Sequence, residues 1–496
     1  MEAKLYGQNK GGTSINGIIK DYYAYAGENI SAGDLVEYVN GAAGKKDYGE
    51  SADTSVNTVI NSGYAISAVA LDENRVFIAH SYNTGYSLRA VVCTIDGATI
   101  TVGTGTILID TNYMGSSIST CLLPNGNVFI AHSYGSDYYL YGIVCTIEGE
   151  TITKGEDTAL VSAKYAGRVI SAITLDDNKV FIAHSLTTSY NLSGIAVTID
   201  GITISAGTDK KISTNGYTGY AISTCLLPNG NIFMATSWAS DYELYGWVIS
   251  INGSAVISHG YKSINVNANA GYAISTCLLP NGNVFIAHSA GSNYQLYGIV
   301  VSISDTTITK GTDTAINTVA NTGQYISTCL LPNGDVFIAH GYGTSDNYLY
   351  GIVVTIVNTE ITAGTDTQLN TTINTGKTTS TLLLNNGAIF LAHSRSVGAS
   401  TYLYLNAQIF GVDYDNNIPT THIIATEYET QIRQVTTGQF DGIAKTSGEG
   451  GDNTGHKDMV SIWTKVPILT QEFAMSDGNT LADANGDIFL VREAIA

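Results

Sequence analysis

The sequence predicts an all-β fold: a seven-bladed β-propeller inserted in a small discontinuous β domain. The first observation is a repeat, because a phrase close to ISTCLLPNGNVFIAHS occurs seven times. Its histidine position recurs at intervals of 52 residues five times and then 53, at His80, His132, His184, Thr236, His288, His340 and His393. The second is that each repeat carries four strand signals. Four antiparallel strands per roughly 50 residues are the design of a propeller blade.

The fifth repeat shows the expected strands in order. The first covers residues 274–279 and ends at the turn Pro280-Asn281-Gly282, and the second covers 283–288. A polar loop, 289–294, leads to a third strand at 296–303 and, after a short turn, to a fourth at about 307–316. Other repeats place Asp-Gly or Asn-Gly in that last turn, a pair that accepts the positive φ of a tight hairpin.

A propeller ring must be sealed where its two chain ends meet, and two segments are candidates for the seal. In the seventh repeat the third strand is expected at 402–412, followed by 421–432, whose TEYETQI mimics the GTDTAI of other fourth strands. The segment 51–57 (SADTSVN), ahead of the first repeat, mimics it equally well. The sequence leaves open which of the two closes the ring.

The flanks, residues 1–48 and 433–496, do not belong to the repeat. Because ring closure brings them together, we expect one small β docking domain built from both, with the propeller, 49–432, inserted between its strands. The segment ISAGDLVEYVNG (30–41) followed by GIAKTSGEGG (442–451) resembles small β modules in structural proteins of bacteriophages and phage-derived particles of Gram-positive bacteria. The repeat phrase FIAHS…YLYGIVVTI also resembles repeats of such phage proteins.

This resemblance implies a virion protein, made and assembled in the host cytoplasm, whose small domain attaches to other virion proteins. The propeller would then be exposed as a tail-fibre, baseplate or head component that binds a host-surface glycan or protein. One alternative is a purely architectural capsid decoration or tail component without a ligand, and another is a cell-wall glycan hydrolase. Head or tail location and oligomeric state, a homo-oligomer included, are left open.

Composition narrows the function classes. The net charge is −20, and nucleic acids and anionic membranes both need clusters of Lys and Arg, so neither is expected as a partner. No run approaches the roughly 20 apolar residues of a membrane span. The N-terminal MEAKLYGQNKGG lacks the apolar centre of a signal peptide.

The most reactive residue types fall into repeat columns, which favours structural roles. Six cysteines occupy positions that other repeats fill with Val, Ile or Leu, so we expect buried free thiols without disulfides or metal. The histidines occupy equivalent positions in successive blades, so they are spread around the ring and cannot converge on one ligand. Asp157, Asp209, Asp313 and Asp366 recur on fourth strands, where we expect them to protect an exposed edge. With no single non-repeating carboxylate pair, the sequence predicts no catalytic residues, no cofactor and no enzyme.

The loops between the second and third strands are the variable part of each repeat. They are rich in Tyr, Ser, Gly, Asn and Asp, the palette of antibody combining loops, and they emerge on the same face as the connections between blades. Ordinary turn chemistry uses several of the same residues. As ligand-binding residues on this face the sequence predicts Tyr82, Tyr134, Asp137, Trp238, Asp241 and Tyr342.

Overall fold

A computed structural model of the chain describes residues 44–427 except 73, 177, 344–346, 385–386, 397–401 and 414–416, with short strands within 7–40 and 430–463. The chain divides into two compact units, Asp47–Ala425 and Met1–Lys46 with Thr426–Ala496. The described residues are all strand, turn or loop, which confirms the all-β class. Among them no helix is long and apolar enough to span a membrane.

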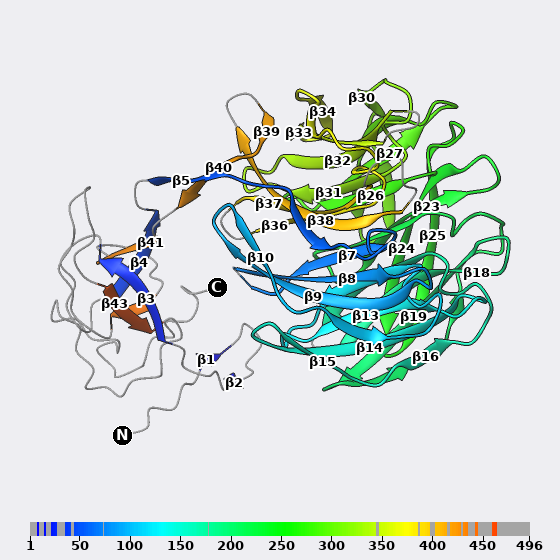
Figure 1. Cartoon of the computed structure of the whole chain (residues 1–496), viewed down its shortest axis with the longest axis horizontal. Helices are drawn as coiled ribbons and strands as arrows, with labels where there is room; N and C mark the ends of the chain where they lie inside the picture. The colour runs from blue at the N-terminus through cyan, green and yellow to red at the C-terminus, as the bar shows by residue number, and fades with distance from the viewer. Residues whose placement is uncertain are drawn as a thin grey trace. The chain divides into compact units, whose positions relative to one another are not determined.

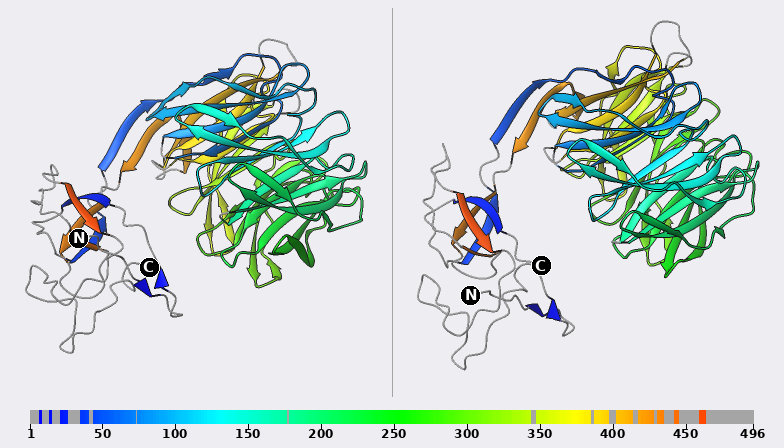
Figure 2. Two further views of the ribbon diagram at one scale, coloured as in Figure 1. Left: turned by 90° about the horizontal axis from the view of Figure 1, so that it is seen from below. Right: turned by 60° about the horizontal axis from the view of Figure 1, so that its bottom comes forward.

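The larger unit is a propeller of seven blades, as predicted (Figures 1 and 2). One strand of each blade packs against its counterparts in the two neighbouring blades, and these seven strands close a ring around the axis. These inner strands are β7 (Ile66–Ala70), β12 (Ile118–Leu122), β17 (Ile170–Asp176), β22 (Ile222–Leu226), β26 (Ile274–Leu278), β31 (Ile326–Leu330) and β36 (Thr379–Leu383).

The second and third strands of each blade form its antiparallel centre. The second strands are β8 (Arg75–Tyr82), β13 (Val128–Tyr134), β18 (Lys179–Leu186), β23 (Ile232–Trp238), β27 (Val284–Ala290), β32 (Val336–Tyr342) and β37 (Ile389–Arg395). The third strands are β9 (Ser87–Asp96), β14 (Tyr139–Glu148), β19 (Asn191–Asp200), β24 (Glu243–Asn252), β28 (Gln295–Ser304), β33 (Tyr348–Val357) and β38 (Tyr404–Asp413).

The outer, fourth strand is broken in two in every blade but the fourth. Both halves pair with the third strand, and the break between them holds the aspartate column. These outer strands are β10 (Thr99–Val102) with β11 (Thr106–Ile109), β15 (Thr151–Lys154) with β16 (Thr158–Val161), β20 (Thr203–Ala206) with β21 (Lys210–Lys211), β25 (Ala255–Asn265), β29 (Thr307–Lys310) with β30 (Thr314–Asn317), β34 (Glu360–Ala363) with β35 (Thr367–Asn370), and β39 (Ile418–Thr420) with β6 (Thr54–Asn57).

The pairing of β6 with β38 answers the question of the seal. The N-terminal segment completes the seventh blade, with Thr54 opposite Ala407 and Asn57 opposite Leu405. The competing segment, 421–432, does not join the blade. Its first part, β40 (His422–Glu427), instead pairs with β5 (Gly44–Glu50) as a two-stranded ribbon.

The core lies within and between the blades. A phenylalanine of each second strand is fully buried, and in blade two the ring of Phe129 packs where a Cβ on Gly142 would stand. Around the axis, serine hydroxyls of one inner strand bond to the next strand: Ser67 Oγ accepts from the Thr120 backbone N–H at 3.0 Å. This contact satisfies the open edge of each inner strand, which would otherwise be left unpaired.

The smaller unit contains a closed sheet with the strand order β3-β41-β4-β42-β43. Its strands are β3 (Asp21–Ala26), β4 (Leu35–Asn40), β41 (Thr430–Gln434), β42 (Gly442–Ala444) and β43 (Met459–Trp463), and β1 (Gly7–Gln8) pairs with β2 (Ser14–Ile15). The rest of 30–41 and 442–451, the segments that resemble phage modules, lies outside the described residues. That this unit docks on a particle stays a prediction.

Candidate functional site

The loops from second to third strands and the connections between blades share one end of the propeller, here called the loop face. The two kinds of loop are fastened to each other. The backbone N–H of Tyr165 donates to the Asp137 carbonyl at 2.7 Å, and the Ser185 hydroxyl donates to the Tyr165 carbonyl at 2.9 Å. A Cβ on Gly167 would collide with the carbonyl oxygen of Tyr139, so the connection can dock this closely only with glycine there. The loop face is therefore built rigidly.

Tyrosines on this face adopt an uncommon backbone conformation. Eight have φ between 49° and 68°, namely Tyr86, Tyr113, Tyr138, Tyr165, Tyr190, Tyr217, Tyr242 and Tyr294. A bulky residue in the left-handed region costs about 1–2 kcal/mol relative to glycine. Asn stands in the same columns of other blades, at Asn269, Asn321, Asn347 and Asn374. The fold therefore accepts a residue better suited to this conformation, and tyrosine is not required by the turn.

The tyrosine rings form two runs of contacts that one arginine joins. We call this set of rings the tyrosine arc: Tyr64, Tyr86, Tyr113, Tyr138, Tyr165, Tyr190, Tyr217, Tyr220, Tyr242, Tyr272 and Tyr294. Neighbouring ring centres lie 4.5–6.5 Å apart. The gap between Tyr165 and Tyr190 is bridged by the Arg168 guanidinium, 5.6 Å and 4.4 Å from their ring centres. The arc covers blades one to five, and beyond it asparagines stand in the same columns at Asn321, Asn347 and Asn374.

The arc is accessible and uncharged. Tyr64 is 46% exposed, and Tyr113 and Tyr217 are also exposed. Burial raises the pKa of Tyr220, and a hydrogen bond with Tyr272 raises it further. Burial likewise raises the pKa of Tyr64 and Tyr190. These hydroxyls are therefore neutral at physiological pH and can both donate and accept hydrogen bonds.

Four residues predicted to bind a ligand lie at the ends of second strands instead of within the loops. Their rings stack on the third strand: Tyr134 on Tyr141 at 4.1 Å and Trp238 on Tyr245 at 4.5 Å. Tyr342 stacks on Tyr350 at 4.3 Å, and the Tyr82 ring lies 4.7 Å from the Arg89 guanidinium carbon. All four are half-buried. They are not brought together, since each belongs to its own blade.

The two predicted aspartates do lie in the loops. The Asp137 carboxylate is 3.1 Å from the Lys164 ammonium and accepts from the Tyr139 hydroxyl at 3.2 Å. Asp241 is exposed, and its backbone carbonyl accepts from Asn269. Sequence reasoning missed the tyrosine arc itself. Its signal was present, because a tyrosine directly precedes the third strand in five of the repeats.

The histidine column is part of the framework, and its partner is the aspartate column. His132 is fully buried; its Nδ1 donates to the Ser133 carbonyl at 2.8 Å, and its Nε2 lies 2.9 Å from the Asp157 carboxylate. The same pair recurs as His184–Asp209, His288–Asp313, His340–Asp366 and His393–Asp53. The expectation that these aspartates protect an exposed edge is wrong, because the break in the outer strand turns them inward to the histidine.

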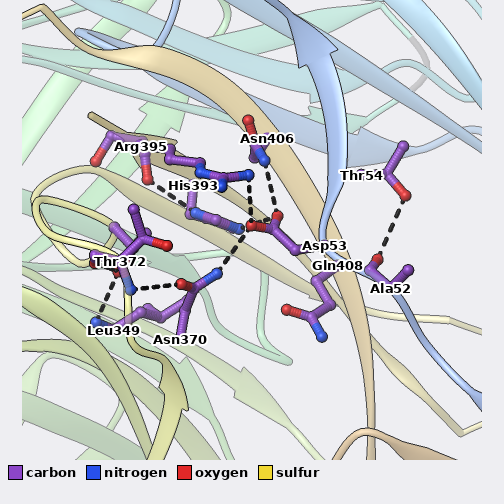
Figure 3. Close-up of polar contacts among 12 residues, drawn as sticks. Ala52, Asp53, Thr54, Leu349, Asn370, Thr372, His393, Arg395, Asn406 and Gln408 are labelled. Carbon is purple, nitrogen blue, oxygen red and sulfur yellow. Dashed lines mark hydrogen bonds and ion pairs between the residues drawn. The ribbon is translucent and has the colours of Figure 1, made fainter. Parts of the chain in front are cut away.

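Asp53 shows how the same pair seals the ring (Figure 3). Its Oδ1 accepts from His393 at 3.1 Å and from Asn406 at 2.9 Å, and its Oδ2 accepts from Asn370 of the preceding blade at 2.9 Å. Burial alone would raise the pKa of this carboxyl, but the bonds and the charge of His393 outweigh burial and lower it to about 2. One residue thus joins the N-terminal segment to blades six and seven.

The six cysteines all lie buried as free thiols, as their column predicts. Burial raises the pKa of Cys93, Cys121, Cys145, Cys225 and Cys277 to about 12. Such thiols are poor nucleophiles. Within the described part of the chain, no group of three or more His, Cys, Asp or Glu side chains is arranged to hold a metal ion.

Comparison with known structures supports the propeller. The chain is similar to a putative 6-phosphogluconolactonase from Bacteroides uniformis (14% identity, 73% of this chain and 100% of that one, TM-score 0.50). It is also similar to a protein from Lactobacillus plantarum (13%, 73% and 98%, TM-score 0.51) and to a six-bladed fungal lectin from Aleuria aurantia (14%, 64% and 98%, TM-score 0.41). No protein-family model and no curated protein sequence matches the chain.

Likeness at this level of identity shows the fold alone. It nevertheless contradicts the expectation that the chain is not an enzyme, because the same propeller arrangement occurs in putative 6-phosphogluconolactonases. That expectation rested on the symmetry of the repeat and the lack of a non-repeating carboxylate pair. The expectation is therefore withdrawn.

Proposed function

We propose that the propeller binds carbohydrate through the tyrosine arc. The observation that carries this proposal is the arc itself: rigidly held, partly exposed rings, many kept in a left-handed backbone conformation that asparagine fits better. Sparsely populated backbone conformations persist where function maintains them. The fold does not require tyrosine at these positions, because asparagine stands in the same columns of other blades, and ligand binding accounts for the retained rings.

Sugars suit this surface chemically. The apolar face of a pyranose ring packs on aromatic rings, while its hydroxyls pair with neutral phenol and amide groups. Tyrosine offers broad contact area with little conformational freedom to lose on binding. The asparagines Asn321, Asn347 and Asn374 continue the polar part of the surface beyond the arc. An extended oligosaccharide matches such a curved surface better than one small sugar.

The proposed binding residues are therefore the arc and its neighbours. Asp137 and Asp241 keep their proposed role, because their loops carry Tyr138 and Tyr242 of the arc. For Tyr82, Tyr134, Trp238 and Tyr342, stacking within the blade already provides a packing role, and a contribution to ligand binding stays a proposal.

Binding of an oligosaccharide library, immobilised as an array, tests the proposal. Tyr138→Asn and Tyr190→Asn remove rings but keep a residue that the repeat uses in the same column. We expect each to weaken binding at least tenfold, which corresponds to about 1.4 kcal/mol. Val357→Ala is the control: Val357 is 62% exposed and ends β33, at the opposite end of the blade from the loop face. Binding by neither the native chain nor any variant, or equal binding by all of them, would contradict the proposal.

We further propose that the chain is a bacteriophage virion protein whose small unit attaches it to the particle. The resemblance of segments 30–41 and 442–451 to phage modules is the support for this assignment. Under it, the ligand is a glycan or protein of the host surface. Peptide mass spectrometry of purified particles from the source strain is the test, and absence of the chain from them would refute it. A virion protein that binds no array glycan or host protein would be the architectural alternative.

A further inference from the structure

Blade one departs from the repeat at two positions whose counterparts in blade two, Asp157 and Tyr141, lie against the histidine. In the break of its outer strand it has Gly105 where other blades have the paired aspartate. On its third strand it has Arg89 in the column of Tyr141, Tyr245, Tyr297 and Tyr350. His80 itself is retained and fully buried. A carboxylate has thus been lost and a cation gained around an unchanged imidazole.

The loss leaves buried polar atoms without partners. His80 Nδ1 donates to the Ser81 carbonyl, as in the other blades, but its Nε2 has no hydrogen-bond partner among the described residues. The Nε of Arg89 is also buried and unpaired. Arg89 Nη2 donates to the Gly105 carbonyl at 3.1 Å, and no carboxylate of the described residues lies within ion-pair distance of the guanidinium.

A third hydrogen-bond donor, the side chain of Asn57, lies beside the position of the missing aspartate in blade one. In three blades an asparagine of the preceding blade donates to the paired aspartate: Asn265 to Asp313, Asn317 to Asp366 and Asn370 to Asp53. Asn57 holds this register ahead of blade one, opposite Leu405, as Asn370 lies opposite Leu349. Among the described residues, its side-chain N–H group has no hydrogen-bond acceptor, whereas its Oδ1 accepts from the Val59 backbone N–H. Imidazole, guanidinium and amide therefore surround the position of a missing carboxylate.

We propose that blade one binds the carboxylate group of a ligand at the place that aspartate fills in five other blades. Those five blades show that the equivalent histidine, with the asparagine in three of them, binds a carboxylate there. Arg89 supplies the positive charge and the paired N–H groups that favour an external carboxylate. The aspartate side chains of the other blades are 18–25% exposed, so this position opens to solvent.

Occupation of the site requires two small changes. The Arg89 guanidinium now lies where a side chain on Gly105 would begin, and it must swing outward along the Tyr82 ring to pair with the ligand. His80 must also take up a proton, because Nδ1 already donates to a carbonyl and a carboxylate can only accept from Nε2. Burial, together with the charge of Arg89, lowers the pKa of His80 to about 4 in the empty site. Binding should therefore strengthen as the pH falls from 7 to 5.

The test follows the imidazole directly. Full-length chain labelled with ¹⁵N-histidine is titrated with sodium acetate and with sodium glucuronate, and the His80 ring signals are identified by their loss in His80→Gln. We expect saturable shifts of the His80 ring toward the protonated form, at least threefold tighter at pH 5.5 than at pH 7. Equal affinities would indicate free carboxylates as ligands, and a tenfold preference for glucuronate would indicate an acidic sugar. No saturable shift with either compound at about 100 mM would overturn the proposal.

The matched control is the double variant Arg89→Tyr/Gly105→Asp, which restores the pair of the other blades. The atoms nearest to a Cβ on Gly105 belong to Arg89, and Gly105 has no left-handed φ, so the change fits. We expect this variant to show no response to acetate, since its own carboxylate fills the site. If it does not fold, Arg89→Gln takes its place, with an expected tenfold loss. A response unchanged in these variants, or an equal response of the native chain to sulfate, would also overturn the proposal.

Discussion

The framework and the loop face of the propeller differ in how much their residues vary between blades, although they are parts of the same repeats. Framework contacts barely change among the five blades that keep the histidine–aspartate pair: the distance from histidine Nε2 to aspartate is 2.9 Å in blades two, five and six. On the loop face, the column that holds Tyr165 in blade two holds Asn269 in blade four and Asn374 in blade six. Positions that pack against the neighbouring blade are alike, whereas positions that meet solvent differ and are available for binding.

The largest effect on stability should come from a change at the seam, the place where the N-terminal segment 51–57 completes blade seven. Asp53→Ala leaves the buried His393 without its carboxylate, which we expect to lower the free energy of unfolding by about 3 kcal/mol. Denaturant titration measures the loss. Because Asp53 also holds the ring closed, residues 44–57 should become sensitive to protease. Asp157→Ala removes the same pair inside an uninterrupted blade and should leave that segment protected; equal cleavage in both variants would contradict a special role for the seam.

Substitutions at two glycines distinguish the effect of a steric clash on the loop face from the effect of a strained backbone φ elsewhere. Gly167→Ala forces a Cβ against the Tyr139 carbonyl, and we expect a loss of about 2 kcal/mol together with weaker glycan binding. Gly126 has φ 83° and open space around it, so Gly126→Ala should cost about 1 kcal/mol and leave binding unchanged. Thermal unfolding and glycan binding are the two measurements. An effect of Gly126→Ala on binding would argue against the loop face as the site.

The seam should also show in the pH dependence of stability. The pKa of Asp53 is lowered from 3.8 to about 2 on folding, so its stabilising contribution is fully present above pH 4 and is lost as the pH falls toward 2. Linkage gives roughly 2 kcal/mol for this contribution. We expect the stability difference between the native chain and Asp53→Asn to shrink as the pH falls from 4 to 2. A difference independent of pH would mean that the carboxylate charge is not what matters.

A smaller effect is expected where the loop face alone is changed. Tyr138→Asn should alter stability by no more than about 0.5 kcal/mol, because asparagine tolerates the φ of 51° better than tyrosine does. Binding should nevertheless fall, as proposed above. A stability loss above about 2 kcal/mol would show that the ring belongs to the framework and would remove the contrast on which the proposed function rests.

The smallest effects should come from the thiols. With their pKa raised to about 12 by burial, Cys225 and Cys277 should not react with an aromatic disulfide reagent at pH 8 while the chain is folded, and should react at once in denaturant. Cys277→Val should cost less than about 1 kcal/mol, since valine and cysteine are similar in size and both are apolar. Rapid labelling of the native chain would place these residues outside the core.

The sequence by itself determined the number of blades, the order of strands within each and the buried columns. Each of these depends on local alternation and on a strict 52-residue period, which are properties of neighbours along the chain. The predicted second strand of repeat five, for example, differs from β27 (Val284–Ala290) by one residue at its start and two at its end. That small error also explains why Tyr134 and Trp238 were assigned to loops: each is the last residue of its strand.

The tertiary structure decided what depends on contacts between blades. Residues 51–57 and 421–432 match the closing motif equally well, and only the ring shows that Asp53 reaches His393, 340 residues away. The histidine–aspartate pairs were likewise hidden, because a whole third strand separates the two residues in sequence. The tyrosine arc appeared only when successive blades placed Tyr113 beside Tyr138 and Tyr217 beside Tyr242. Local pattern specifies one blade, whereas the packing of seven specifies the surfaces that they share.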